Sequence, residues 1–372
     1  MQCSKNTLQQ IVGVAALFAA STVHAELALN LPEPVSPITE DIFGLHMLTA
    51  KVALYIMVVV TAIIIYSLIK FRKSEGYVAD QTFHEGKFGR FGWILVPIIV
   101  LGVDMMIAGP GMETLNNVED YSEPDMTVKV IGSQWKWTYE YLDEGIRVVS
   151  NMKELEPDDE LYLRDVDNPL VLPTGKRIRF LHTATDVLHA WWVPAIVYKK
   201  DSIPGYINET WTVIEKEGTY RGQCAENCGT GHAYMPIVVE AVSEEKYAAW
   251  LAEQKETTAA AAAEAASDKE WSKSELISRG EELYNKSCVA CHQANGAGIP
   301  GIFPSLIGSP ITIGPVDEHI NIVVKGKAGT AMAAWGSQLN DLEIAAIVTF
   351  ERNSWGNDTG DTVQPVAVKA AR

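Results

Sequence analysis

The sequence predicts a multidomain membrane protein, with a two-helix transmembrane hairpin followed by an all-β domain and a small all-α domain. Three patterns carry this prediction. Two long apolar stretches lie in the first third of the chain, short runs of alternating polar and apolar residues fill the middle, and apolar residues at helical spacing follow. The 372 residues are enough for two or three domains of ordinary size.

The composition excludes two classes of protein. The chain has 30 Lys and Arg against 47 Asp and Glu, a net charge of −17. Nucleic acid is therefore excluded as a partner, because binding a polyanion requires a basic surface. A hydrophobic content of 47% with 10 Trp excludes a wholly disordered chain.

Residues 1–25 are typical of a signal peptide. Lys5 supplies a positive start, residues 11–20 an apolar core, and Val23-His24-Ala25 a cleavage site of small residues. A short buried helix is the alternative interpretation. Cleavage removes Cys3 and leaves a periplasmic segment over 26–44. The four remaining cysteines then lie in the exported part, where cysteines usually form disulfides or bind metals.

Residues 45–69 and 91–109 are the predicted transmembrane helices, since about 20 apolar residues span a bilayer. The second contains Pro97 and Asp104, so a soluble core helix is the alternative there. Asp104 is either a functional acid or a contact to a partner helix. The connecting loop over 70–90 carries the basic residues Lys70, Arg72, Lys73, Lys87 and Arg90. By the positive-inside rule this loop is cytoplasmic, and both flanking regions are outside.

Residues 110–251 predict an antiparallel β-sandwich or barrel, because their apolar residues alternate with a period of two. The predicted strands are 126–131, 135–141, 176–181, 209–214 and 237–242. The Ala- and Glu-rich residues 252–272 are expected to be a linker that is at most partly helical. Residues 273–356 show helical spacing over 274–283 and 341–352 and form the predicted all-α domain. Residues 357–372 are expected to be a tail.

The all-α domain contains the motif Cys288-Val-Ala-Cys291-His292, which is typical of covalent haem c attachment. Two thiols at this spacing attach to the vinyl groups of one haem, and the histidine binds the iron. Pro304 is expected to accept a hydrogen bond from the free nitrogen of His292. Met332 is the expected second axial ligand, with His319 as the rival. The segment from Gly326 to Glu343 resembles class I cytochrome c domains, although Ala333 stands where those commonly have Pro.

A second cluster of metal donors lies in the β domain. Cys224, Cys228, His232 and Met235 fall within one short segment, and His189 lies upstream. Thiolate, imidazole and thioether donors are typical of copper electron-transfer sites. With a loop carbonyl there are six donors, which exceed one tetrahedral site and suit two bridged coppers. A Cys224–Cys228 disulfide and a structural Cys2His2 zinc site are the alternatives, but neither explains Met235.

These motifs together resemble subunit II of cytochrome c oxidase in the haem-copper oxidase family. The resemblance rests on the donor segment from Cys224 to Pro236, the upstream segment Asp186-Val-Leu-His189-Ala-Trp and the run GSQWKWTYEY over 132–141. The haem motif makes the chain similar to members with a fused C-terminal cytochrome c domain. The resemblance implies that residues 110–251 form a cupredoxin-like all-β barrel and that residues 273–356 form an all-α class I cytochrome c domain.

The resemblance also implies roles for individual residues. The ligands of a dinuclear copper A centre would be the side chains of His189, Cys224, Cys228, His232 and Met235 and the carbonyl of Glu226. The carboxylate of Glu226 would reach a Mg ion at the boundary with subunit I. Trp135 would be the residue at which electrons arrive. Arg90 occupies a position where many members have a glutamate of a proton inlet, and Glu85 lies nearby.

The function that the resemblance implies is an electron relay in the respiratory chain. Electrons would pass from a donor to the haem on His292 and Met332, then to the copper pair, and on to subunit I. Neither apolar stretch has the histidines that an oxygen-binding haem needs, so oxygen reduction is expected in subunit I. The donor would be a soluble cytochrome c or a cytochrome bc complex, and subunit III a further partner. The chain would cross the bacterial inner membrane twice, with both redox domains periplasmic.

Two other functions remain open at this point. The first is a membrane-tethered copper and haem electron carrier that serves another terminal reductase. The second is a copper-binding assembly or sensing protein. The haem and the segment from Trp135 to Tyr141 argue against an assembly or sensing protein. Glu226 and the two-helix anchor favour an oxidase subunit over a separate electron carrier. The acidic residues Glu154, Glu156, Asp158, Asp159 and Glu160 either steer a basic donor or form a solvated face.

Overall fold

The structure is a computed structural model that describes residues 30–372 except 73, 75, 79, 266, 268 and 337. Residues 34–372 form one compact unit, and the elements below all belong to it. The predicted signal peptide over 1–25 lies outside the described residues.

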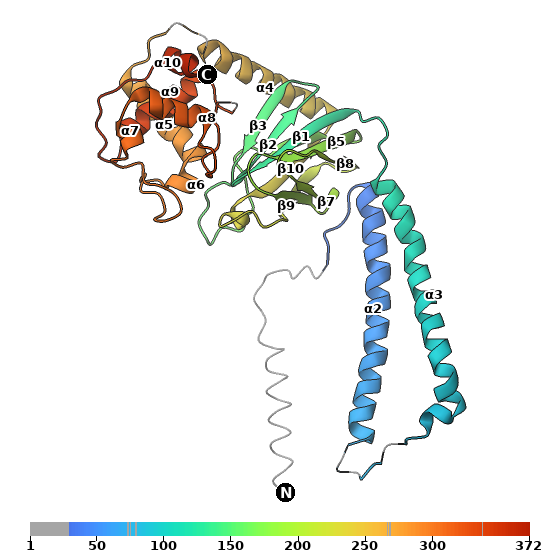
Figure 1. Ribbon diagram of the computed structural model, residues 1–372. Coiled ribbons are helices and arrows are strands. Elements are labelled where there is room, and N and C mark those ends of the chain that lie inside the picture. The colour runs from blue at the N-terminus through green and yellow to red at the C-terminus, as the bar shows by residue number, and fades with distance from the viewer. Residues whose placement is uncertain are drawn as a thin grey trace. The chain divides into compact units, whose positions relative to one another are not determined.

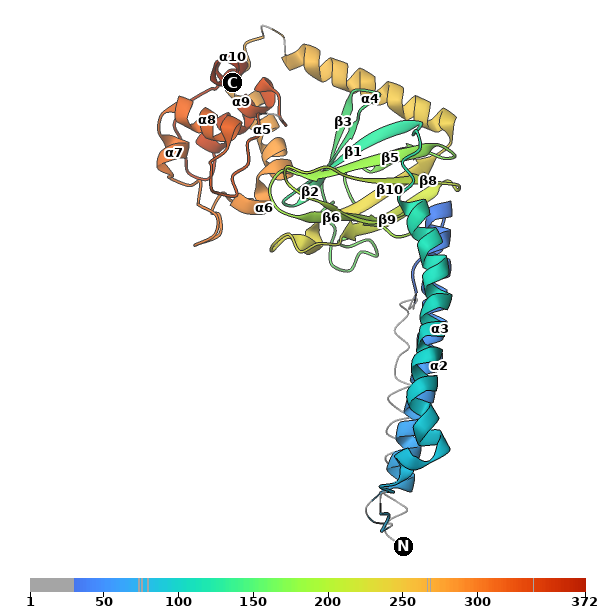
Figure 2. The same ribbon diagram turned by 45° about the vertical axis from the view of Figure 1, so that its right-hand side comes forward.

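Two long helices, α2 (Pro37–Lys70) and α3 (Lys87–Val118), run alongside each other (Figures 1 and 2). Both are long and apolar enough to cross a membrane. They extend beyond the predicted stretches because polar residues continue each helix. At the start of α2, for example, Ser36 and Thr39 form a capping box. At about 1.5 Å per residue each helix exceeds the roughly 30 Å apolar core of a bilayer, so part of each lies outside it.

The loop between the two helices contains the short helix η2 (Phe83–Glu85). Arg90 lies in the first turns of α3, and its Nη2 donates to the backbone carbonyl of Glu85 at 3.4 Å. The guanidinium therefore contacts the main chain of Glu85.

The outer ends of both helices are attached to the β domain by hydrogen bonds. At α2, the Ser36 hydroxyl donates to the carbonyl of Ile196, and the Thr39 hydroxyl donates to the carbonyl of Ala195. At α3, the Trp211 Nε1 donates to the carbonyl of Asn117 at 3.0 Å. Ser36 and Thr39 are buried. These bonds hold the β domain against the ends of the two helices.

The β domain is a sandwich of two five-stranded sheets (Figure 1). One sheet has the order β3 (Ile146–Ser150), β2 (Lys136–Tyr141), β1 (Met126–Ser133), β5 (Arg177–Ala184) and β8 (Asn208–Val213). The other has the order β4 (Leu170–Pro173), β10 (Pro236–Val242), β9 (Gly218–Cys224), β6 (His189–Val193) and β7 (Val197–Ser202). Large side chains between the sheets, among them Trp137, Tyr139 and Trp191, are fully buried.

The five predicted strands are all present, but the antiparallel prediction holds only in part. β1 pairs with β5 in parallel, and β10 pairs with β4 in parallel. Each parallel pair joins strands that are distant in sequence, which a pattern of alternation cannot reveal. Strands β3, β4, β6, β7 and β9 were not predicted. Of these, β6 begins at His189 and β9 ends at Cys224, so the unpredicted strands position two candidate donors.

Helix α4 (Glu244–Ala265) covers most of the expected linker and is more helical than the sequence predicted. The helix begins against the sandwich, where Tyr247 is buried and Trp250 packs against the core. The following Ala-rich residues have the highest helix propensity, so they continue a helix that tertiary packing has already nucleated. Helix α4 contacts β3 and β4, which are edge strands of the two sheets, and Figure 2 shows it beside β3.

The C-terminal domain is all-α, as predicted. Its helices are α5 (Lys273–Ser287), α6 (Val289–His292), α7 (Pro310–Ile313), α8 (Val316–Lys325), α9 (Asp341–Arg352) and α10 (Pro365–Ala371). Helices α5 and α9 pack closely at Gly280, where a Cβ atom would lie 2.1 Å from the carbonyl oxygen of Ala346. Residues 357–372, which were expected to be a tail, contain α10, and Val363 and Val368 lie in the domain core.

Arg352 links α9 to the surrounding loops of this domain. Its side chain is buried and donates to Asp361 and to the carbonyls of Thr312 and Gly314. Burial alone would raise the pKa of Asp361, but the hydrogen bonds from Arg352 and Thr359 and the charge of Arg352 together outweigh burial and lower the pKa. This carboxylate therefore stabilises the fold fully above its ordinary pKa, and the contribution is lost as the pH falls through the lowered value.

We expect Asp361→Asn to destabilise the C-terminal domain by about 1–3 kcal/mol, because it removes the charged partner of a buried guanidinium. Urea unfolding of the purified chain at neutral pH and at pH values below the ordinary Asp range measures this difference. The difference should shrink in acid. The matched control is Asp358→Asn at an exposed position of the same loop. Equal effects of the two substitutions would contradict the assignment.

Candidate metal and haem sites

Three of the predicted copper donors lie together inside the β domain. His189 begins β6, Cys224 ends β9, and Cys228 lies in the loop that follows. All three are buried, and their donor atoms lie within 4.8 Å of one another. Adjacent strands of one sheet therefore bring together donors that are distant in sequence.

The remaining predicted donors are arranged around the two sulfur atoms. Around the Cys224 Sγ lie the His189 Nδ1, at 4.0 Å, and the carbonyl oxygen of Glu226, at 3.3 Å. Around the Cys228 Sγ lie the His232 Nδ1 and the Met235 Sδ, each at 3.5 Å. Each sulfur thus has one imidazole and one weaker donor. The two sulfurs are 3.9 Å apart and both thiols are free, so the disulfide alternative does not apply to this structure.

Asp186 orients the upstream histidine. The Nε2–H of His189 donates to the Asp186 Oδ1 at 2.9 Å, so the Nδ1 lone pair faces Cys224. A metal-binding histidine commonly donates its other ring N–H to a carboxylate in this way. Burial would lower the pKa of His189, but Asp186 and Cys224 together outweigh burial and raise that pKa. The sequence motif contained Asp186, but only the structure shows its contact.

The two thiols interact directly. The hydrogen-bond contact between their sulfurs lowers the pKa of Cys224 and raises the pKa of Cys228. The interaction therefore favours the thiolate form of Cys224 over that of Cys228. A thiolate is the form of cysteine that binds metals.

Trp135 contacts the donor loop. Its Nε1 donates to the carbonyl of Cys228 at 3.1 Å, and the Gln134 Nε2 donates to the same carbonyl at 2.8 Å. The indole ring also packs on Gly231, where a Cβ atom would lie 2.1 Å from the ring. Glycine is required at this position, because any side chain would displace the tryptophan.

The haem motif lies at the junction of two helices in the C-terminal domain. Cys288 is the C-cap of α5, and α6 carries the rest of the motif. The Nδ1–H of His292 donates to the carbonyl of Pro304 at 3.1 Å, which confirms the predicted contact. The other ring nitrogen, Nε2, is therefore the one available to an iron atom. Cys288, Cys291, His292 and Met332 all line one cavity of about 340 Å³.

The chemistry of both donor sets fits the expected groups. The sandwich site offers thiolate, imidazole, thioether and carbonyl donors in two matching halves, which suits a pair of coppers. The helical site offers two thiols and an imidazole on one wall of a cavity that is mostly apolar and also contains Met332. This set suits a covalently attached haem.

Comparisons with known proteins agree with this chemistry. Residues 126–242 match the family described as cytochrome c oxidase subunit II, periplasmic domain, and residues 24–114 match its transmembrane domain. A probable cytochrome c oxidase subunit 2 from Rickettsia bellii is 37% identical over 235 residues, covering 62% of this chain and 86% of that protein. The chain belongs to the cytochrome c oxidase subunit II family.

Other comparisons extend this assignment. Subunit 2 from Cereibacter sphaeroides is 34% identical over 271 residues, covering 64% of this chain and 88% of that protein. The solved periplasmic domain of subunit II from Bradyrhizobium japonicum is 40% identical, covering 37% of this chain and 99% of that one, with a TM-score of 0.35. Residues 275–350 match the family described as cytochrome c oxidase, cbb3-type, subunit III. This subunit II is thus a membrane protein with a periplasmic β domain and a fused cytochrome c domain.

Proposed function

We propose that this subunit II receives electrons from a periplasmic donor and passes them to subunit I of a respiratory oxidase, which reduces oxygen to water. The observation that carries the proposal is the division of the six predicted donors into two matching groups, one around each sulfur. A single structural zinc would be four-coordinate with the two thiolates and two imidazoles, so it would not account for the thioether and the carbonyl. A member of this family with such a site is suited to one-electron transfer.

The proposed copper ligands are His189, Cys224, Cys228, His232 and Met235, with the carbonyl of Glu226. A bound copper pair supplies a one-electron centre that changes oxidation state with little rearrangement. The buried sandwich holds these donors in place, and Asp186 fixes the tautomer of His189. The backbone carbonyl of Glu226 is the proposed copper ligand, and its side-chain carboxylate is the proposed ligand of a Mg ion at the boundary with subunit I.

The proposed haem attachment uses Cys288 and Cys291, with His292 and Met332 as axial ligands. A haem with these ligands supplies a second one-electron centre of raised potential. Pro304 orients the imidazole of His292. Met332 lies in the loop after α8, where the backbone N–H of Lys327 donates to its carbonyl.

A contact between the two domains supports transfer from one site to the other. The Lys136 Nζ lies 4.1 Å from the centroid of the Trp335 ring, three residues after Met332. Lys136 directly follows Trp135, which contacts the copper loop. Burial lowers the pKa of Lys136 to about 8. The segment that carries Trp135 therefore lies against the proposed haem domain, and we assign Trp135 as the residue at which electrons reach the copper site.

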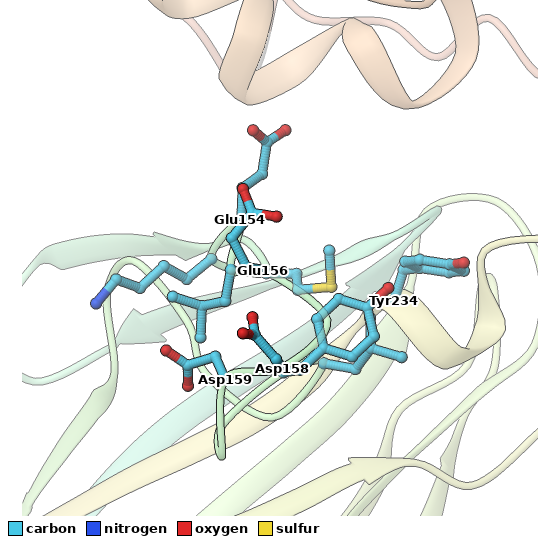
Figure 3. A pocket seen from close by; sticks show the side chains of 10 residues that line it. Glu154, Glu156, Asp158, Asp159 and Tyr234 are labelled. Atoms are coloured by element: carbon cyan, nitrogen blue, oxygen red, sulfur yellow. The ribbon is translucent and has the colours of Figure 1, made fainter.

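The proposed partners are subunit I, subunit III and a soluble cytochrome c or cytochrome bc complex, at the bacterial inner membrane. A cavity of about 850 Å³ lies beside the copper loop and is lined by Glu154, Glu156, Asp158, Asp159 and Tyr234 (Figure 3). Tyr234 belongs to η3 (His232–Tyr234), which begins at a proposed ligand. An acidic surface in this position can steer a basic donor toward the copper site.

We expect Asp158→Asn with Asp159→Asn to slow reduction of the complex by a basic soluble cytochrome severalfold at low salt. The difference should vanish at high ionic strength, because salt screens exposed charges. Stopped-flow measurements at several salt concentrations test this. The matched control removes the same charge from α4, with Glu253→Gln and Glu256→Gln at exposed positions. A rate that is indifferent to salt in the unmodified complex would exclude steering.

The proposed function is tested on the complex purified in mild detergent. We expect it to consume oxygen when a reduced donor is supplied, and we expect Trp135→Ala to slow this consumption severalfold while the copper content is retained. The control is Trp250→Phe, which alters an aromatic residue packed against the same core but distant from the donor loop. A complex that contains copper and haem but consumes no oxygen would overturn the proposal.

A further inference from the structure

The C-terminal domain contains a buried histidine–glutamate contact that the proposed electron path does not use. The His319 Nε2 lies 2.8 Å from the Glu351 Oε2, and the two side chains are only 3% and 6% exposed. His319 comes from α8 and Glu351 from α9. Both residues line the same cavity as the haem-attachment motif. The pair is therefore part of the wall against which a haem would lie.

His319 has an unused polar atom. Its Nδ1 is buried and has no hydrogen-bond partner among the residues that the structure describes. Every buried polar group without a partner costs free energy. Because the histidine lines the cavity, a group bound in the cavity can supply the missing partner.

The neighbouring groups narrow down the partner that the Nδ1 of His319 can have. The neighbouring cation, Arg352, is committed to Asp361 and to two backbone carbonyls, so it does not neutralise Glu351. A buried carboxylate requires a nearby positive charge. His319 is the side chain in hydrogen-bond contact with Glu351, and an imidazole that bridges two acceptors donates from both ring nitrogens, so that Nδ1 carries a hydrogen.

The acceptors that haem carries at its rim are its two propionates, since the rest of the porphyrin rim is apolar. A hydrogen bond between an imidazolium and a carboxylate is short and strong in a buried setting. We propose that His319, held by Glu351, is a binding subsite for one haem propionate, with the Nδ1–H of His319 as the donor. This inference rests on the proposed haem attachment and deepens it.

The proposal predicts that two substitutions shift the haem midpoint potential in opposite directions. His319→Leu removes the hydrogen-bond donor and leaves the negative charge of the propionate uncompensated, which favours oxidised haem and lowers the potential. Glu351→Gln removes a negative charge and raises it. We expect each change to alter the reduction equilibrium by about tenfold, which is about 59 mV for a one-electron couple. His319→Gln keeps a neutral donor and should lie closer to the unmodified protein.

Redox titration of the purified complex, with resonance Raman spectra of the propionate bending bands, tests this subsite. The bands should shift in His319→Leu and shift less in His319→Gln. Unchanged bands, or potentials that move the same way in His319→Leu and Glu351→Gln, would show a merely structural pair and overturn the proposal. Loss of the low-spin haem spectrum in His319→Leu would overturn it in favour of iron ligation by His319. Staining of the unmodified chain for covalent haem distinguishes failure of this subsite from failure of the proposed function. An unmodified chain without covalent haem would contradict the proposed function itself.

Discussion

Replacing Cys228 with serine is expected to abolish the copper site and with it nearly all oxygen consumption by the complex. Cys228 has three neighbours from the donor set, the Cys224 Sγ at 3.9 Å and the His232 Nδ1 and Met235 Sδ at 3.5 Å. Serine cannot replace a thiolate that is shared between two metals. Changes in outer-shell partners already cost about 10–100-fold in metal affinity or activity, so we expect a loss greater than about 100-fold here.

Metal analysis and turnover of the same preparation measure this effect. The matched control is Thr230→Ala, because Thr230 is an exposed residue of the same loop and lies between two donors in sequence. It should retain both the copper and the activity. Full copper content in Cys228→Ser would refute the assignment of Cys228 as a bridging ligand. Haem content should be unchanged in both variants, which separates loss of copper from failure of the chain to fold.

The second large effect concerns the fused haem domain. Substituting both Cys288 and Cys291 with alanine should eliminate covalent haem, because no other pair of described cysteines lies beside a histidine of the domain. The rate of donor-driven oxygen consumption should fall by roughly tenfold or more. An attached carrier acts at an effective concentration near the millimolar range, and a freely diffusing donor must replace it.

The copper content of this double variant should remain normal, since the copper donors all lie in the β domain. Val289→Ala is the matched control, because it changes the same motif without removing a thiol. Haem staining of the denatured chain and oxygen uptake with a small chemical reductant complete the measurement. A double variant with an undiminished donor-driven rate would show that electrons do not pass through the fused domain.

The cluster of candidate copper donors was predictable because most of its members are close in sequence. Four of the donor side chains lie between Cys224 and Met235, so the spacing alone indicated the chemistry. The role of Asp186 was not predictable in the same way. Its carboxylate reaches His189 only because the chain turns into β6 at this point, and it also accepts a hydrogen bond from the backbone of Gln134. Contacts of this kind depend on tertiary structure.

In the transmembrane helices and the helical domain, too, the features that depend on tertiary contacts could not be predicted from the sequence. Hydropathy located both membrane spans but not their ends, because Ser36 starts α2 in a polar segment that packs on the β domain. In the C-terminal domain, spacing predicted α5 and α9, and the capping box at Asn340 is present. His319 on α8 and Glu351 on α9 are 32 residues apart in sequence, and only the packing of α8 on α9 reveals their contact.

The central claim is that this chain holds two coppers bridged by Cys224 and Cys228. Electron paramagnetic resonance of the oxidised complex, combined with metal analysis, tests it most directly. We predict two coppers per chain and a mixed-valence signal in which one unpaired electron is shared equally by both copper nuclei. A single zinc without such a signal, or the spectrum of one isolated copper, would contradict the account.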